Sequence, residues 1–465
     1  MDDSKHLRVV ASGGISTFSY NGSTLVIQRL DKKNLDVPLR QVLWVQYVEQ
    51  ALEVHFLARK KPGAPLSLVK ARGAVHKDDR PHATEWVEAL MDAAYQGTKR
   101  NRHLKVLVNP KGGQGKAVSA FRKKVEPIFH AAQCSLDVTY TRHPKHAYAL
   151  AKELSLDYDA VVTVSGDGLI HEVINGLAQH TQPRRALTIP IAPIPTGSGN
   201  GLSLNLLGIE DGFDLAAAAL NVIKGRPMKT DLFSFTQNGN RHFSFMSQAV
   251  GLMADLDLGT ESLRWMGDTR FLLGFLRGVL RFKPCPVTLS IKVAERDKVK
   301  MAEYIRSVQP KDDEIHRQED QLDQPHDTLP PLKHSDLDED WISLDTPLLY
   351  IYAGQGPYVG RDLMQFPVSL PDDGLIDVVA QELTSRGDML KAMDEAEKGA
   401  PYWMEGQHYF KAYAYRVTPH SLKGCLAVDG EAYPFEEFQV EVHPKLATLL
   451  SPHGRYASEF VVPGR

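Results

Sequence analysis

Residues 160–176 read AVVTVSGDGLIHEVING, and the order of residue types in this stretch decides the fold class. The apolar run Ala160 to Val164 predicts a strand, and Ser165 to Gly168 predict a glycine turn. The residues after the turn, Leu169 to Gly176, predict a helix. A strand followed closely by a helix is the repeating unit of an α/β layer.

The same alternation continues on both sides of this stretch. Further strands are predicted at Leu104 to Val108, Leu136 to Tyr140 and Leu187 to Ile194. Strands that alternate with helices favour βαβ units and a mainly parallel sheet. We therefore expect an α/β domain at 103–228.

The two regions on either side of this α/β domain are predicted to contain mainly strands. Residues 1–98 contain short strand-like runs followed by one helical run, Ala83 to Tyr95, which predicts a small β domain. That domain resembles a pleckstrin-homology-like barrel, and an unrelated small β domain is the alternative. Residues 229–455 are rich in strand patterns, among them a single strand at Phe243 to Val250, and predict an antiparallel second domain.

An acidic insertion interrupts the second domain at about 312–340. Acidic residues outnumber Lys and Arg there by eleven to two, and apolar residues are few. Such a composition does not bury enough apolar surface to offset the entropy of ordering, so we expect this segment to be disordered.

Three glycine-rich loops follow successive predicted strands of the α/β domain. They are Asn109 to Lys116, Ser165 to Gly168 and Pro195 to Gly201. Glycine lets backbone N–H groups approach phosphate oxygens closely, and a helix N-terminus behind each loop adds partial positive charge. Three such loops together predict a site for a phosphorylated ligand.

Neither of the two common nucleotide-binding motifs fits these loops. The residues Gly112 to Lys116 do not match the spacing Gly-x-x-x-x-Gly-Lys-Ser/Thr of a Walker A loop. In Gly197 to Gly201 the third glycine comes one residue too early for the dinucleotide motif Gly-x-Gly-x-x-Gly. A different phosphate-binding fold is therefore expected.

The motifs resemble those of the diacylglycerol-kinase catalytic superfamily, and within it the sphingosine kinases. The match includes four motifs in chain order: Asn109 to Lys116, Ser165-Gly-Asp-Gly168 with the helix after it, Pro195 to Asn200, and Val428 to Glu431. The resemblance implies a two-lobed core, a Rossmann-like α/β domain and an antiparallel β-sandwich, that follows the small β domain. It also implies an ATP-dependent lipid kinase that uses Mg²⁺ to phosphorylate the primary hydroxyl of a sphingoid base.

The resemblance assigns roles to individual residues. Asp167 is expected to act as general base, Asp257 to neutralise the substrate ammonium, and Asp429 to lie near the Mg²⁺ ion. The bland alternative for Asp167 is an aspartate that only caps the next helix. Expected nucleotide contacts are Asn109, Lys111, Gly112, Gly113, Thr141, Ser165, Gly166, Gly168, Glu172, Gly197, Ser198, Gly199, Asn200, Arg264, Arg270, Asp429, Gly430 and Glu431. Expected substrate contacts besides Asp257 are Asp255, Glu261, Phe271, Leu272 and Phe275.

The run from Phe271 to Phe282 is apolar on nearly every side. It suits a buried core helix or, as we expect from its place after the head-group residues, the wall of a tunnel for a long hydrocarbon chain.

Composition limits the partners and the compartment. A formal net charge of -3 gives no general attraction for nucleic acid, and none is expected as a partner. Three widely spaced cysteines favour a reducing, cytoplasmic environment over a disulfide framework. With a lipid as substrate, we expect peripheral association with a membrane surface, while the sequence leaves protein partners open.

Three other functions share features with this sequence. A kinase for ceramide or diacylglycerol has the same Ser-Gly-Asp-Gly core, but its neutral substrate needs no carboxylate at Asp257. An NAD kinase has a related turn, although Ser165 and the apolar run argue against it. A catalytically inactive lipid-binding scaffold is the third alternative.

Overall fold

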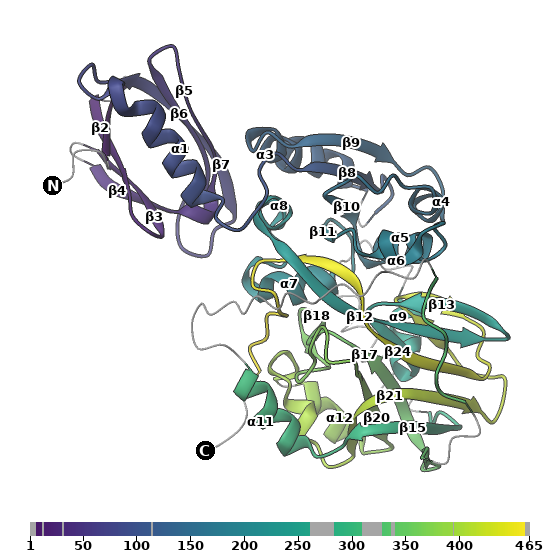
Figure 1. Ribbon diagram of the computed structural model, residues 1–465. Helices are drawn as coiled ribbons and strands as arrows, with labels where there is room; N and C mark the ends of the chain where they lie inside the picture. Colours follow the sequence, from purple (N-terminus) through teal and green to yellow (C-terminus); the bar gives the residue numbers. More distant parts are fainter. Residues whose placement is uncertain are drawn as a thin grey trace.

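The computed structural model describes residues 6–11, 14–29, 32–112, 115–260, 283–308, 328–335, 340–393 and 395–460. These residues form three regions in chain order: a small β domain, an α/β layer and a β-rich lobe (Figure 1). The fold class expected from the sequence, α/β plus β with an antiparallel sheet at the N-terminus, is confirmed.

The small β domain wraps one sheet around one helix. Its described strands pair antiparallel in the order β4-β3-β2-β1-β7-β6-β5, and Trp86 and Leu90 bury the inner face of α1 against them. The elements are β1 (His6–Ala11), β2 (Gly14–Tyr20), β3 (Thr24–Arg29), β4 (Lys32–Pro38), η2 (Leu39–Gln41), β5 (Val42–Val48), β6 (Ala51–Arg59), β7 (Leu66–Val75), η3 (Arg80–His82) and α1 (Ala83–Ala94).

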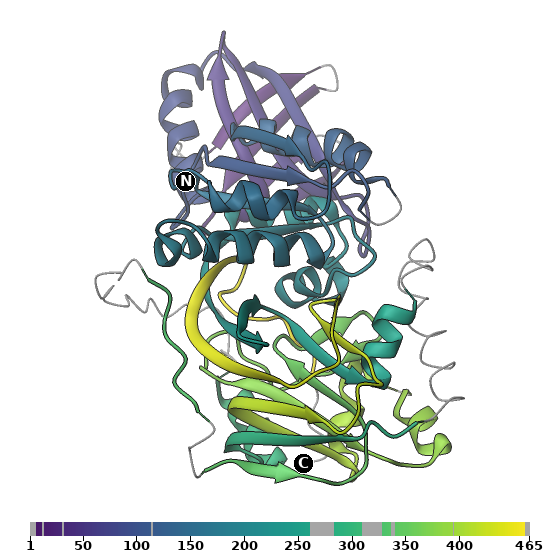
Figure 2. The same ribbon diagram turned by 90° about the vertical axis from the view of Figure 1, so that its right-hand side faces the viewer.

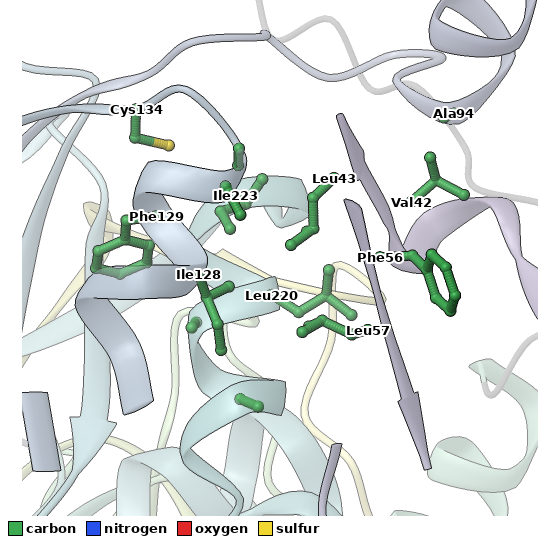
Figure 3. Packing of buried hydrophobic residues seen from close by; sticks show 14 of the residues in the cluster. Val42, Leu43, Phe56, Leu57, Ala94, Ile128, Phe129, Cys134, Leu220 and Ile223 are labelled. Carbon is green, nitrogen blue, oxygen red and sulfur yellow. The ribbon is translucent and has the colours of Figure 1, made fainter. Parts of the chain in front are cut away.

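The small β domain shares a hydrophobic core with the α/β layer. Leu43 and Leu57 face Ile128 and Leu220 of the next region, while Phe56 points to the opposite side of the sheet (Figure 3). All of these side chains are buried. Burial of apolar surface on this scale holds the two regions together.

The α/β layer is built on four parallel strands. β8 pairs with β9 and β10, and β10 pairs with β11, all in parallel register. Every residue of β10 is buried, as expected for a strand covered on both faces. The elements are β8 (His103–Val108), α2 (Ala117–Ala120), η4 (Phe121–Val125), α3 (Glu126–Ala131), β9 (Ser135–Tyr140), α4 (His146–Lys152), β10 (Ala160–Ser165), α5 (Asp167–Ala178), α6 (Pro183–Leu187), β11 (Ile191–Pro195), α7 (Gly201–Asp211) and α8 (Leu215–Lys224).

The β-rich lobe begins with β12 (Arg226–Gln237) and ends with β24 (Phe438–Ser451). These two long strands pair with each other, and β24 also joins β11 in parallel at Ile191 and Leu449. The last strand therefore runs back into the α/β layer and makes one continuous sheet of the two lobes (Figure 2).

The remaining elements of this lobe are arranged around that pair of strands. They are β13 (Asn240–Ser244), β14 (Ser247–Gly251), α9 (Leu252–Gly259), β15 (Val287–Glu295), α11 (Lys298–Val308), β16 (Ile342–Leu344), β17 (Leu348–Gly354), β18 (Tyr358–Gly360), β19 (Leu363–Met364), β20 (Ile376–Glu382), α12 (Arg386–Met393), η6 (Ala396–Lys398), η7 (Ala400–Trp403), β21 (Gln407–Pro419), β22 (Leu426–Val428) and β23 (Glu431–Tyr433).

Two strands predicted from the sequence have different bounds in the structure. The strand expected at Leu187 to Ile194 starts only at Ile191, because Pro183 opens a short helix that ends at Leu187. The strand expected at Phe243 to Val250 is divided into β13 and β14. Its middle N–H groups, those of Phe245 and Met246, donate to the carboxylate of Asp429.

Part of the insertion expected to be disordered is ordered. Residues 328–335 lie against β24. There the backbone N–H groups of Lys333 and His334 donate to the buried carboxylate of Glu441. Gln439 Nε2 also donates to the carbonyl of His334 at 2.9 Å. For these eight residues the prediction from composition is wrong, because the anchor comes from a distant strand. Residues 312–327 and 336–339 lie outside the described residues.

Candidate active site

The three glycine-rich loops meet at one edge of the sheet. Because β8, β10 and β11 are parallel, their carboxyl ends point to the same side, where α/β proteins bind their ligands. A Cβ atom on Gly166 would lie 2.5 Å from the carbonyl oxygen of Gly199, and one on Gly197 would lie 2.2 Å from the Cα of Gly166. The second and third loops therefore touch backbone to backbone, which only glycine permits.

Asp167 sits at the junction of these loops. Its carboxylate accepts the N–H of Gly201 at 2.7 Å and that of Leu202 at 3.3 Å, at the N-terminus of α7. Burial raises the pKa of Asp167 to about 6, in spite of these hydrogen bonds, and the nearby carboxylates of Asp429 and Asp257 raise it as well. Asp167 thus caps α7 and not α5, the next helix in the chain, which the alternative named and which has no side-chain cap; it is also a buried carboxylate whose pKa lies close to neutral pH.

Asp429 is the centre of a saturated hydrogen-bond network. One carboxylate oxygen accepts from Ser244 Oγ and from the N–H groups of Met246 and Ser247, at 2.8 to 3.0 Å. The other accepts from the N–H of Phe245 and interacts with His171 Nδ1 at 2.8 Å. The side chain is fully buried.

These contacts assign Asp429 a structural role. Burial lowers the pKa of His171, but the hydrogen bond to Asp429 and the charges of Asp429 and Glu431 outweigh that effect and raise it overall. Direct metal coordination would require Asp429 to give up donors it already has, so its geometry argues against the role of metal ligand expected from the sequence.

Asp257 and Glu431 bring two more carboxylates to the same place. A Cβ on Gly430 would lie 3.7 Å from Asp257 Oδ2, and a Cβ on Gly168 would lie 3.5 Å from Glu431 Oε1. Both residues line the cavity described below. Asp255, expected as a substrate contact, does not: it lies on another face of α9, where its hydrogen bond, after burial, raises the pKa of Cys425.

One cavity of about 980 Å³ joins the glycine loops to the β-rich lobe. Its size suits a site that holds a nucleotide together with part of a second ligand. The residues predicted from the sequence that line it are Asn109, Lys111, Gly112, Thr141, Ser165, Gly166, Asp167, Gly168, Glu172, Gly197, Ser198, Gly199, Asp257, Asp429, Gly430 and Glu431.

Two of the expected nucleotide contacts brace the loops. Asn200 is buried, accepts the N–H of Gly197 at 3.1 Å and donates to its carbonyl at 2.9 Å, and it does not line the cavity. Glu172 does line it, but both of its carboxylate oxygens accept N–H groups, from Lys145 and Ala147, and so fix the loop that carries Thr141. Seven expected site residues lie outside the described residues: Gly113, Glu261, Arg264, Arg270, Phe271, Leu272 and Phe275.

The structure adds a second half to the cavity that sequence reasoning missed. Apolar side chains from α9, α12 and the segment after it line this half, together with tyrosines of β17. Met253 and Leu256 stand three residues apart beside Asp257, a helical spacing that could have indicated them. The other lining residues come from distant segments and carry no such signal; they include Tyr350, Tyr352, Arg361, Leu363, Met389, Met393, Pro401 and Met404.

Comparison with known proteins identifies relatives of this chain. Residues 103–235 match the diacylglycerol kinase catalytic domain, and residues 6–96 match a domain of unknown function. Among curated proteins, sphingoid long chain base kinase 4 of Schizosaccharomyces pombe is 33% identical over 94% of this chain and 93% of its own length. Sphingosine kinase 1 of Homo sapiens is 31% identical over 74% of this chain and 90% of its own.

Among solved structures, a Bacillus anthracis protein of diacylglycerol kinase type shares the fold. It aligns with a TM-score of 0.51 and 19% identity, over 76% of this chain and 98% of its own. At this identity the likeness concerns the arrangement of the two lobes only.

Proposed function

This chain belongs to the sphingoid long-chain base kinase family, and from that premise we propose its reaction and the roles of its residues. The protein is an ATP-dependent lipid kinase that phosphorylates the primary hydroxyl of a sphingoid base. The observation that carries the mechanism is the single cavity in which the three glycine loops, Asp167 and Asp257 lie next to an apolar half.

Asp167 acts as the general base. It takes the proton from the primary hydroxyl of the base as that oxygen attacks the γ-phosphorus of ATP and the bond to the bridging oxygen of ADP breaks. Its two backbone hydrogen bonds fix the carboxylate without using all of its lone pairs. Most of the remaining rate enhancement comes from positioning and from neutralising phosphate charge.

Asp257 anchors the head group. A carboxylate neutralises the ammonium of a sphingoid base, which ceramide and diacylglycerol lack. Behind it, the apolar side chains of α9 and α12 receive the hydrocarbon chain.

The phosphate charge is met from several sides. The glycine loops supply backbone N–H groups, and Arg264 and Arg270, outside the described residues, stay our prediction for a guanidinium clamp. Mg²⁺ usually binds one or two carboxylates together with substrate phosphates, and when bound it neutralises charge on the transferring group. We assign its protein ligand to Glu431, which is exposed at the cavity, in place of Asp429.

The site of action is a membrane surface reached from the cytoplasm. A long-chain base partitions into membranes, so the enzyme meets its substrate there. Within the described residues no helix is both long and apolar enough to cross a bilayer. Co-sedimentation with vesicles that contain sphingosine tests the peripheral association.

A transfer assay with radiolabelled ATP tests the substrate class. Sphingosine, dihydrosphingosine and phytosphingosine are expected to be phosphorylated, and ceramide and diacylglycerol much less. Equal transfer to diacylglycerol would contradict the assignment, and ATP-independent lipid binding without transfer would favour the scaffold alternative.

The pH dependence of catalysis should report the ionisation of Asp167. Its pKa is raised to about 6, so the base is ionised above that pH and protonated below it. We expect kcat/KM to be constant near neutral pH and to fall about tenfold per pH unit below pH 6. The measurement is a pH profile of kcat/KM, with Asp255→Asn as the control, because Asp255 does not line the cavity and is not among the carboxylates that raise the pKa of Asp167. A profile that is flat down to pH 4.5 would contradict the assignment.

Replacing Asp257 by asparagine should separate sphingoid bases from neutral lipids. A charge-assisted hydrogen bond stabilises by about 1.5 to 3 kcal/mol, so kcat/KM for sphingosine should fall by about 10- to 100-fold. The affinity for ATP should hardly change. The matched control is Asp255→Asn on the same helix, which we expect to leave sphingosine use within about twofold of wild type. If Asp257→Asn spares sphingosine or weakens ATP equally, Asp257 is structural.

A further inference from the structure

Four buried polar side chains line the part of the cavity that belongs to the β-rich lobe: Tyr350, Gln365, Gln381 and Gln407, which we call the glutamine row. Each is at most 4% exposed. Tyr350 of β17 pairs with Gln381 of β20, which pairs with Gln407 of β21. Paired residues project from the same face of a sheet, so these three cross the strands in one line.

Hydrogen bonds connect the glutamine row internally. Gln407 Nε2 donates to the hydroxyl of Tyr350 at 3.2 Å and to Gln381 Oε1 at 3.3 Å. Gln381 Nε2 donates to the carbonyls of Glu382 and Gly406, both at 3.1 Å. Gln365 completes the row, because it is as buried as the other three side chains and lines the same part of the cavity.

One hydrogen-bond donor of the glutamine row has no acceptor among the described residues. Gln365 Nε2 is buried and has no hydrogen-bond partner among the described residues. A buried polar group without a partner is unfavourable by about 1 to 3 kcal/mol, and such groups are rare in folded proteins. Because Gln365 lines the cavity, a ligand in the cavity is the natural source of the missing partner.

The surroundings of the row specify the kind of group that fits. The neighbouring lining residues are apolar: Leu363, Met389, Met393, Pro401 and Met404. A plain hydrocarbon suits these walls but leaves the amide unpaired. A hydroxyl on that hydrocarbon satisfies both, because it accepts one hydrogen bond and donates another.

The row lies beyond the place of the head group. Tyr352 lines the same cavity as Asp257, whose charge, after burial, raises the pKa of that tyrosine. Tyr350 is two residues further along the same face of β17, about 6.6 Å away at the usual rise of a strand. Gln381 and Gln407 follow on the next two strands, each about 4.8 Å further. A chain that enters at Asp257 and runs across the sheet passes over the row.

We propose that the glutamine row recognises a hydroxyl group on the hydrocarbon chain of the sphingoid base, beyond the amino-diol head. The row thereby selects chain-hydroxylated bases over unsubstituted ones. This rests on the proposed function, from which the substrate class is taken.

The test compares bases that differ by a single chain hydroxyl. Dihydrosphingosine is the unsubstituted reference, and phytosphingosine and synthetic dihydrosphingosines with the extra hydroxyl further along the chain form the panel. The wild-type enzyme should use at least one hydroxylated base about 5- to 150-fold more efficiently than the reference. In Gln365→Met, which keeps the side-chain length but removes the amide, this preference should fall to below about threefold while the reference is used at least as well.

Met389→Leu is the matched control, because it changes a cavity wall without touching the amides and should keep the wild-type preference. Equal efficiency of the wild-type enzyme for all bases overturns the proposal, since the amide is then met by bound water. A loss of equal size for every base in Gln365→Met also overturns it. These results differ from a failure of the proposed function, in which the wild-type enzyme phosphorylates no sphingoid base at all.

Discussion

Replacing Asp167 by asparagine is expected to lower kcat by about 100- to 10,000-fold, the usual contribution of a general base. The amide keeps the shape of the side chain but takes up no proton at neutral pH. One amide oxygen still accepts the N–H of Gly201, and asparagine is a good N-cap, so α7 and the third glycine loop should stay in place. The protein should therefore fold normally and still bind ATP.

Single-turnover phosphate transfer, together with ATP titration and thermal unfolding, checks this prediction. Retained ATP affinity and Tm with a large loss of transfer identify Asp167 as the base. Transfer within about threefold of wild type would end that assignment. A parallel loss of Tm and ATP binding would show that the helix-capping role dominates.

Replacing Asp429 by asparagine should mainly destabilise the fold. An amide at this position turns its NH₂ group toward donors, because both carboxylate oxygens already accept hydrogen bonds. The change also removes the charge that His171 faces. Leaving a buried donor without its acceptor is unfavourable by about 1 to 3 kcal/mol, so Tm should fall clearly and activity should fall with it.

Glu431→Gln is the matched variant, since Glu431 occupies the same turn but is exposed. We expect it to keep the wild-type Tm and to raise the Mg²⁺ concentration needed for half-maximal activity. The two variants thus separate a structural carboxylate from a metal ligand. If Asp429→Asn unfolds like wild type and only the Mg²⁺ requirement rises, Asp429 is the metal ligand and our assignment of Glu431 is wrong.

The nucleotide half of the site was predictable because its residues lie in short local motifs. A glycine loop at a strand end requires only its neighbours in sequence, and parallel pairing of β8, β10 and β11 then brings three loops to one edge. The glycine loops were therefore found from the residues themselves, and Asp167 from the resemblance of the motif Ser165 to Gly168. Local patterns of apolar residues also predicted the alternation of strands and helices, and the structure confirms the fold class that this alternation indicated.

Side-chain direction was not predictable from the same motifs. Asp255 and Asp257 stand two residues apart, yet on a helix they lie on different faces, and only Asp257 lines the cavity. Asn200 and Glu172 belong to the matching motifs, but their hydrogen bonds to the backbone show that they hold loops in shape. A motif places a residue near the ligand, and the hydrogen-bond partners of that residue decide whether its side chain contacts the ligand.

The order of the three regions and the three glycine loops could be predicted from the residues alone, because these depend on contacts between near neighbours, and the resemblance of the surrounding motifs pointed to Asp167 and Asp257. The other features depend on contacts between distant segments. The network around Asp429, the anchoring of residues 328–335 by Glu441 and the glutamine row all join segments 26 to 258 residues apart. Such contacts follow from the register of β14, β17, β20, β21 and β24 in one sheet, and strand register is a property of the packed sheet that no single strand contains.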